Sequence, residues 1–176
     1  PAAQAQAYAS DGFVQPFCDS PLDEEPIGEN VYLNLIAQAE RYIYVNTPYL
    51  ILNNVMLSAL CSAAKRGIDV RIVTPFHADK WFVHSMTRSN YETLIESGVK
   101  IYEYTPGFLH AKSMLVDDIH AVVGTINLDF RSLYLHFECG VYMYKTQSLR
   151  HLKEDYLDTL SKCQAITLES CRAVRL

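Results

Sequence analysis

Two pairs of polar residues in the middle of the chain have types and spacing suited to phosphate chemistry. His110 and Lys112 are separated by one residue, and Thr125 and Asn127 repeat that spacing. We expect a strand over residues 108–116, in which residues two apart project from the same face. An imidazole can attack phosphorus, or protonate a leaving oxygen, near neutral pH. The ammonium of Lys112, the hydroxyl of Thr125 and the amide of Asn127 can each donate to a phosphate oxygen.

Asp117 and Gly124 extend these pairs into a longer motif. The chain contains His-x-Lys, four further residues, Asp117, and then Gly124-Thr-x-Asn. A glycine at position 124 lets another backbone segment approach closely. The segment from His110 to Asp117 could arise by chance in an unrelated sequence. The addition of Gly124-Thr-x-Asn at a fixed offset makes a chance match very rare. This combination resembles the signature of the phospholipase D superfamily.

The surrounding residues narrow the resemblance. Three segments, 46–49, 107–112 and 124–138, resemble the C-terminal half of a bacterial cardiolipin synthase, and the similarity runs from about Gly12 to Leu160. Enzymes of that family carry two such motifs in one polypeptide, preceded by N-terminal membrane helices. This chain has one motif, and no stretch approaches the roughly 18–20 apolar residues of a membrane-spanning helix. It also lacks an initiator methionine. We therefore expect the second catalytic half, cut from a longer enzyme.

The resemblance implies an activity and a role for each site residue. The implied reaction moves a phosphatidyl group from one phosphatidylglycerol to the hydroxyl of another, releasing glycerol through a phosphohistidine. The implied catalytic residues are His110, Lys112, Asp117, Asn127 and Glu138. In two-motif members the nucleophilic histidine is usually assigned to the first half, so His110 is expected to be the acid and base.

The other residues bind or orient groups in this picture. Lys112, Thr125 and Asn127 would bind the phosphoryl group. Glu138 matches a downstream carboxylate that orients a histidine. Asp117 belongs to the motif, but it lies seven residues beyond His110 and we expect a structural role for it. No metal or other cofactor is implied, because the lysine and asparagine donors take the place of a metal ion.

Two other functions stay open. The first is a complete single-motif phosphodiesterase or nuclease that builds one site from a homodimer. The length fits that function, whereas the acidic net charge and the run from Asn127 to Glu138 fit it poorly. The second is a non-catalytic half that binds anionic lipid and serves as an assembly module.

Composition restricts the class of protein. The 176 residues are 49% hydrophobic and 20% charged, which is typical of one globular domain and excludes a disordered tail. The net charge of −5 argues against nucleic acid as the main partner, since phosphate backbones need a basic face. The five cysteines are scattered and odd in number, so we expect reduced thiols rather than a disulfide framework.

Domain organisation, partners and location follow as expectations. We expect an irregular leader over residues 1–11 and a phospholipase D-like catalytic half-domain over residues 12–176. The expected partners are an anionic phospholipid substrate, phosphatidylglycerol, and either the N-terminal half of the parent enzyme or a homodimer mate. The parent would reside at the bacterial cell membrane through a segment that this chain lacks, with this piece itself soluble.

Alternating strand and helix patterns predict the fold. Strands are expected over residues 12–17, 41–46, 68–74, 99–104, 108–116, 119–124 and 140–144, and helices over 29–40, 54–66, 79–97 and 147–163. This order predicts an α/β fold with a phospholipase D-like mixed sheet, flanked by helices on both faces.

Overall fold

The computed structural model describes residues 11–77 and 86–173. Its strands are β1 (Phe13–Asp19), β2 (Tyr42–Asn46), β3 (Leu50–Ile51), β4 (Asp69–Pro75), β5 (Lys100–Tyr104), β6 (Ser113–Val116), β7 (His120–Gly124), β8 (Leu128–Asp129), β9 (Glu138–Tyr144) and β10 (Cys163–Ile166). Its helices are α1 (Ile27–Gln38), α2 (Asn54–Lys65), α4 (Tyr91–Glu96), α5 (Phe130–Tyr134), α6 (Ser148–Ser161) and α7 (Leu168–Ala173).

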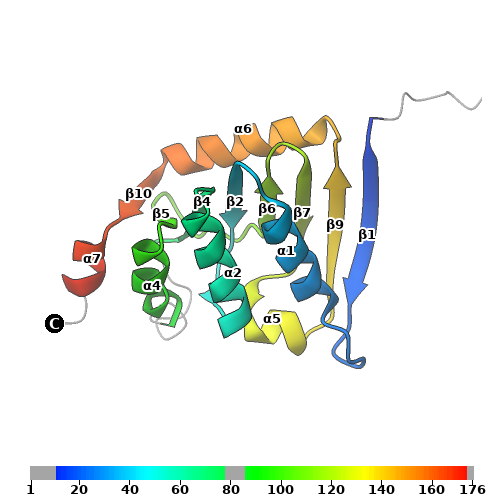
Figure 1. Ribbon diagram of the computed structural model, residues 1–176, viewed down its shortest axis with the longest axis horizontal. Coiled ribbons are helices and arrows are strands. Elements are labelled where there is room, and N and C mark those ends of the chain that lie inside the picture. Colours follow the sequence, from blue (N-terminus) through cyan, green and yellow to red (C-terminus); the bar gives the residue numbers. More distant parts are fainter. Residues whose placement is uncertain (1–10, 78–85, 174–176) are drawn as a thin grey trace, which may run out of the picture.

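Eight strands form one mixed sheet in the order β1-β9-β7-β6-β2-β4-β5-β10 (Figure 1). Strands β2, β4 and β5 run parallel to one another, and the remaining neighbours pair antiparallel. The short strands β3 and β8 form a separate parallel pair near the end of β2. The predicted α/β fold with a mixed sheet is confirmed.

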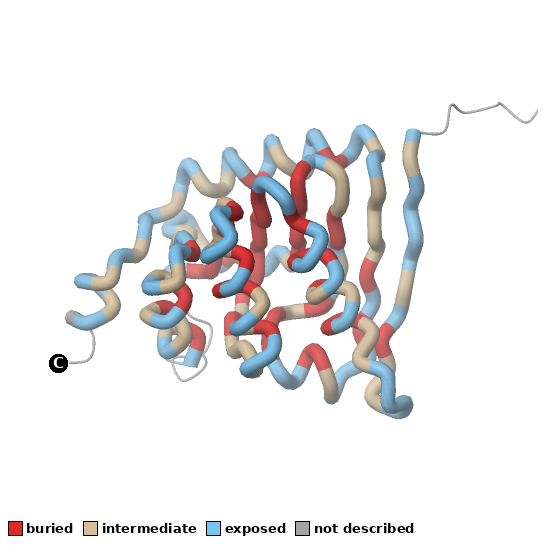
Figure 2. The backbone as a smooth tube through the Cα atoms, in the orientation of Figure 1, coloured by how far each residue is buried: buried red, intermediate tan, exposed pale blue. Residues whose placement is uncertain are grey.

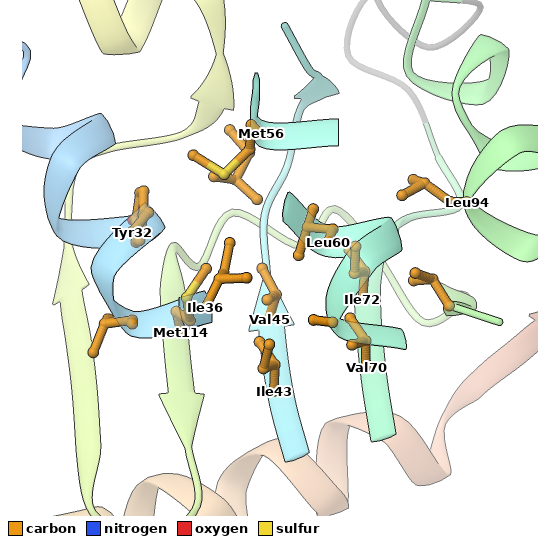
Figure 3. Packing of buried hydrophobic residues seen from close by; sticks show 14 of the residues in the cluster. Tyr32, Ile36, Ile43, Val45, Met56, Leu60, Val70, Ile72, Leu94 and Met114 are labelled. Atoms are coloured by element: carbon orange, nitrogen blue, oxygen red, sulfur yellow. The ribbon is translucent and has the colours of Figure 1, made fainter. Parts of the chain in front are cut away.

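Apolar residues cover both faces of the sheet, which is why β2 is buried along its whole length. Ile43 and Val45 project toward α1 and α2, where they join the larger core (Figure 3). Tyr42 and Tyr44 project to the other face and pack with residues of α6, including Tyr156. Figure 2 shows buried residues in the centre of the sheet and mostly exposed residues in the edge strand β1. The prediction of helices on both faces is confirmed.

The strand predicted over residues 108–116 is shorter in the structure. Only Ser113–Val116 pairs as β6, and His110 and Lys112 lie in the irregular segment before it. The reason is topological, because β2 and β4 separate β5 from β6 in the sheet. The chain between β5 and β6 must therefore cross the end of the sheet instead of pairing within it.

Other boundaries also differ from the predictions. The closing helix ends at Ser161, and the chain continues into β10, which extends the sheet beside β5. Part of the predicted helix 79–97 lies outside the described residues; the described part is helical over residues 86–89 and again in α4. The expected leader also lies outside them, apart from Asp11.

Candidate active site

The motif residues gather at one end of the sheet, where the parallel strand β2 finishes. Asn46 at the end of β2 pairs with Ser113 at the start of β6, and Ser113 pairs in turn with Val123 near the end of β7. Gly124 pairs with Gly140 near the start of β9. Three motif residues thus lie at the same end of adjoining strands: Lys112 before β6, Thr125 after β7 and Glu138 at the start of β9. In Figure 1 this is the end of the sheet where α5 lies. Ligands of open α/β sheets bind beyond the carboxyl ends of such parallel strands.

Gly124 permits the close approach of β7 and β9 at this end of the sheet. A Cβ atom on residue 124 would lie 2.3 Å from the carbonyl oxygen of Cys139 and 2.7 Å from Cα of Gly140. Both neighbours are backbone atoms, so no side chain can move aside. The backbone N–H of Thr125 then donates to the Cys139 carbonyl at 2.9 Å. The glycine of the motif is therefore a steric requirement for placing Thr125.

A network of hydrogen bonds through two hydroxyls joins Thr125, Asn127 and Glu138. The Thr125 hydroxyl donates to Oε2 of Glu138. Ser132 Oγ donates to Oε1 of the same carboxylate at 2.6 Å and accepts the backbone N–H of Asn127 at 2.8 Å. Because Ser132 and Glu138 are both buried, these bonds hold the segment between Thr125 and Asn127 in one position.

Sequence reasoning did not single out Ser132. It lies in the first turn of α5, where its backbone N–H donates to Asp129 Oδ1 at 3.0 Å, with Asp129 as the helix N-cap. An aspartate three residues before a serine is a recognisable cap signal, and it could have predicted this short helix. The contact with Glu138 depends on the path of the chain and had no local signal.

Lys112 is half-buried beside this network. Its ammonium donates to the backbone carbonyl of His110 at 2.7 Å. Burial lowers the pKa of Lys112 below its usual value, while the nearby negative charges of Glu138 and Asp129 raise it in part. The structure therefore places a cation next to the donors predicted to bind phosphate.

The imidazole of His110 is exposed, and its ring stacks on Phe108 with centroids 5.4 Å apart. Among the described residues, neither ring nitrogen of His110 has a hydrogen-bond partner. The Glu138 carboxylate contacts Thr125 and Ser132 instead, and His136 Nδ1 lies 3.8 Å from its Oε1. A contact between Glu138 and His110 is thus not made within this part of the chain.

Asp117 lies at the opposite end of β6 from Lys112. Its buried carboxylate accepts the backbone N–H groups of Glu40, Arg41 and Tyr42 at 2.6, 2.9 and 2.7 Å. It also has a positive φ of 57°, in the turn between β6 and β7. This placement removes Asp117 from the group around Lys112, and we assign it the structural role of anchoring the start of β2.

Comparison with known proteins identifies the family. A family model described as "Cardiolipin synthase, PLD-like domain" matches residues 32–159. This chain belongs to that family. The PLD-like domain is 40% identical over 162 residues to a cardiolipin synthase of Halalkalibacterium halodurans, covering 92% of this chain and 32% of the relative. It is 51% identical over 158 residues to an uncharacterized protein of Streptococcus mutans, covering 90% and 34%. The domain spans about a third of the length of these curated relatives.

Solved structures show the same fold. Nuc of Salmonella typhimurium, a phospholipase D family member, has a TM-score of 0.74 and 19% identity, covering 89% of the PLD-like domain and 99% of Nuc. A phosphatidylserine synthase of Haemophilus influenzae has a TM-score of 0.69 and 16% identity, covering 87% and 40%. At these identities the likeness establishes the phospholipase D fold alone.

A second asparagine of the PLD-like domain lies close to the motif. Leu128 N–H donates to Thr47 Oγ1 at 3.3 Å, which brings the segment after β2 against the segment that follows Asn127. Within the described residues, the side-chain oxygens of Asn46 and Asn127 are both buried without a hydrogen-bond partner. Unpaired buried polar atoms are uncommon in proteins and each calls for an explanation, such as a catalytic role. The proximity of these two asparagines supports this end of the sheet as the functional site.

No group of three or more His, Cys, Asp or Glu side chains is arranged to hold a metal ion in residues 11–77 and 86–173. Over the same residues, no helix of the PLD-like domain combines the length and apolar character needed to cross a membrane.

Proposed function

We propose that this domain is the C-terminal catalytic half of a cardiolipin synthase. It would transfer a phosphatidyl group between two molecules of phosphatidylglycerol and release glycerol. The observation that carries the proposal is the half-buried Lys112 ammonium beside the network that positions Thr125 and Asn127. The relatives named cardiolipin synthase support the substrate class.

The proposed reaction has two displacements at phosphorus. A histidine from a second motif attacks the phosphorus of the first phosphatidylglycerol, and the bond to the glycerol head group breaks. His110 protonates the departing glycerol oxygen, which leaves a phosphohistidine. His110 then takes the proton from the hydroxyl of the second phosphatidylglycerol, whose oxygen attacks phosphorus and displaces the histidine. Two displacements replace one difficult exchange.

Lys112 and Asn127 would stabilise the charge that develops on the phosphoryl oxygens. Thr125 is less available to a phosphoryl oxygen than Lys112 and Asn127. Its hydroxyl donates to Glu138, and its oxygen accepts the Cys139 N–H at 3.0 Å. We therefore propose that Thr125 contributes mainly by linking Glu138 to the segment that carries Asn127. Glu138 would also keep Lys112 charged and, when a partner half is present, orient a histidine.

Partners and location belong to the same proposal. The partners would be phosphatidylglycerol and a second motif, from an N-terminal half or from a homodimer mate, without nucleic acid. The parent protein would act at the bacterial cell membrane through a segment outside this chain. A single-motif phosphodiesterase acting as a homodimer is the second candidate. One observation favours it: Nuc matches over 99% of its own chain, so a chain of this size forms a whole solved protein.

Product analysis separates the two candidates. The domain, combined with a separately expressed N-terminal half of a relative, is expected to convert phosphatidylglycerol in vesicles to cardiolipin and an equal amount of glycerol. Thin-layer chromatography of labelled lipid and a glycerol assay measure both products. Phosphatidic acid without cardiolipin, or cleavage of DNA with no reaction on lipid, would instead support the phosphodiesterase.

Substitution of Glu138 is expected to be milder than substitution of His110. Glu138→Gln keeps one oxygen acceptor for the two hydroxyls, whereas His110→Ala deletes the group that moves the proton. Glu138 also raises the pKa of Lys112, so its neutralisation should move the alkaline limb of the rate profile to lower pH. Turnover measured against pH for both variants checks this. A larger loss in Glu138→Gln than in His110→Ala would contradict the assignment.

A further inference from the structure

Two exposed cysteines face each other at the edge of the sheet. Strand β1 lies beside β9 (Figure 1). Cys18 of β1 and Cys139 of β9 are direct partners in the antiparallel register, and both thiols are free. Directly opposed residues of an antiparallel pair project from the same face of the sheet. The two thiols therefore share one solvent-exposed face, although 120 residues lie between them in the sequence.

The backbone hydrogen bonds show that this pair is the closer of the two antiparallel types. The N–H and the carbonyl of Cys139 both point away from β1, toward Thr125: the N–H donates to Thr125 Oγ1 and the carbonyl accepts the Thr125 N–H. Cys18 and Cys139 are thus a non-hydrogen-bonded pair, whose Cα atoms typically lie about 4.5 Å apart. That separation is within the range of about 4.4–6.8 Å found for disulfides.

The other three cysteines are less suited to such chemistry. Cys61 is buried in the core. Burial raises the pKa of the Cys163 thiol to about 11, and its Sγ lies 3.2 Å from the Thr159 carbonyl oxygen. Cys171 lies half-buried in the terminal helix α7. Oxidation follows thiolate character and exposure, so Cys18 and Cys139 are the favoured pair.

We propose that Cys18 and Cys139 form a dithiol site that hydrogen peroxide oxidises to a disulfide and that a dithiol reductant restores. One thiolate attacks a peroxide oxygen, giving a sulfenic acid and one molecule of water after proton transfer. The second thiolate attacks the sulfenic sulfur, the S–S bond forms and hydroxide leaves as a second water. The two thiols lose two electrons and two protons, and one peroxide is reduced to two waters.

The dithiol site lies beside the candidate active site. Cys139 directly follows Glu138, and Glu138 is the register partner of Asp19, which follows Cys18. Asp19 in turn accepts the backbone N–H of Gly28 at 2.6 Å at the start of α1. A disulfide would therefore join β1 covalently to β9, the strand that carries Glu138 and contacts Thr125, while α1 is linked to β1 through the Asp19 hydrogen bond. This inference stands on the register and does not depend on the proposed function.

Controlled oxidation of the reduced 176-residue chain tests the proposal. One equivalent of hydrogen peroxide at low protein concentration is expected to remove the mass of two hydrogen atoms from the monomer. Peptide mapping without reductant should find the Cys18–Cys139 link, and dithiothreitol should reverse it. A typical disulfide contributes about 2–4 kcal/mol, and in a chain of this size each kcal/mol raises the thermal midpoint by about 2–4 °C, so we expect a rise of about 4–16 °C.

Single cysteine-to-serine variants test which thiols form the link. Cys18→Ser and Cys139→Ser should each abolish the intramolecular link and the rise in thermal midpoint, whereas Cys61→Ser and Cys171→Ser should retain both. The proposal is overturned if both thiols stay free under these conditions, if they end as separate sulfinic acids, or if the only links involve another cysteine or another chain.

Discussion

Lys112→Ala is expected to lower turnover by about two orders of magnitude or more, with the fold intact. The reason is that this ammonium would stabilise charge on the phosphoryl oxygens in the transition state, where one such donor is worth about 10² to 10³ in rate. Lys112 lies at the end of the sheet, half-buried, and its side chain bonds only to the neighbouring His110 carbonyl among the described residues. Steady-state rates on phosphatidylglycerol, in a preparation that contains a second motif, measure the effect.

Asn127→Ala should show a loss of the same order, because it removes an amide donor to the phosphoryl oxygens. The fold should stay intact, since the Asn127 side-chain oxygen has no hydrogen bond within the described residues that the substitution would break. Lys65→Ala is the matched control: it removes the same charge from the exposed end of α2, and its rate should stay at the wild-type level. Circular dichroism of all three variants verifies the fold. Near-normal turnover in both Lys112→Ala and Asn127→Ala would contradict the site, whereas loss of all activity would exclude the purely lipid-binding module.

The domain by itself is expected to be inactive on phosphatidylglycerol as a monomer. One motif supplies one histidine, but the proposed chemistry needs a nucleophile and an acid on opposite sides of the phosphorus at once. Activity should return only when a second motif faces His110, from an N-terminal half or from a second copy across a two-fold axis. Assays of the domain over a dilution series, with the molar mass followed by light scattering, measure this dependence.

Addition of an N-terminal half provides the control. If that half restores activity at dilutions where the domain alone is monomeric and inactive, the active site is shared between the two halves. The same half with its motif histidine replaced by alanine should fail to restore turnover. Full specific activity from a demonstrable monomer would overturn the half-site proposal, because a single His110 would then suffice.

Much of the fold was predictable because its signals are local. Alternation along residues 41–46 predicted β2, and the order of strands and helices along the chain predicted a sheet covered on both faces. A local cap also begins α2, where the Asn53 side chain accepts the Met56 N–H at 2.8 Å. The short strands β3 and β8 were missed because two residues carry too little periodicity to read, and the helix α5 is marked only by its Asp129 cap.

The sequence by itself determined which side chains could act on phosphate. Residue types and spacing singled out His110, Lys112, Thr125 and Asn127, and Gly124 has the steric reason that was expected. These inferences needed only the chemistry of each side chain and short offsets along the chain.

Only the tertiary structure decided how those side chains are held. Asp117 binds backbone N–H groups more than seventy residues away, and Ser132 reaches Glu138 only because α5 folds back beside β9. Likewise, Lys112 lies outside β6 because two other strands separate β5 from β6. Cys18 meets Cys139 through a strand register that no local pattern contains. Such contacts follow from the order and register of the strands, which are set by packing of the whole chain.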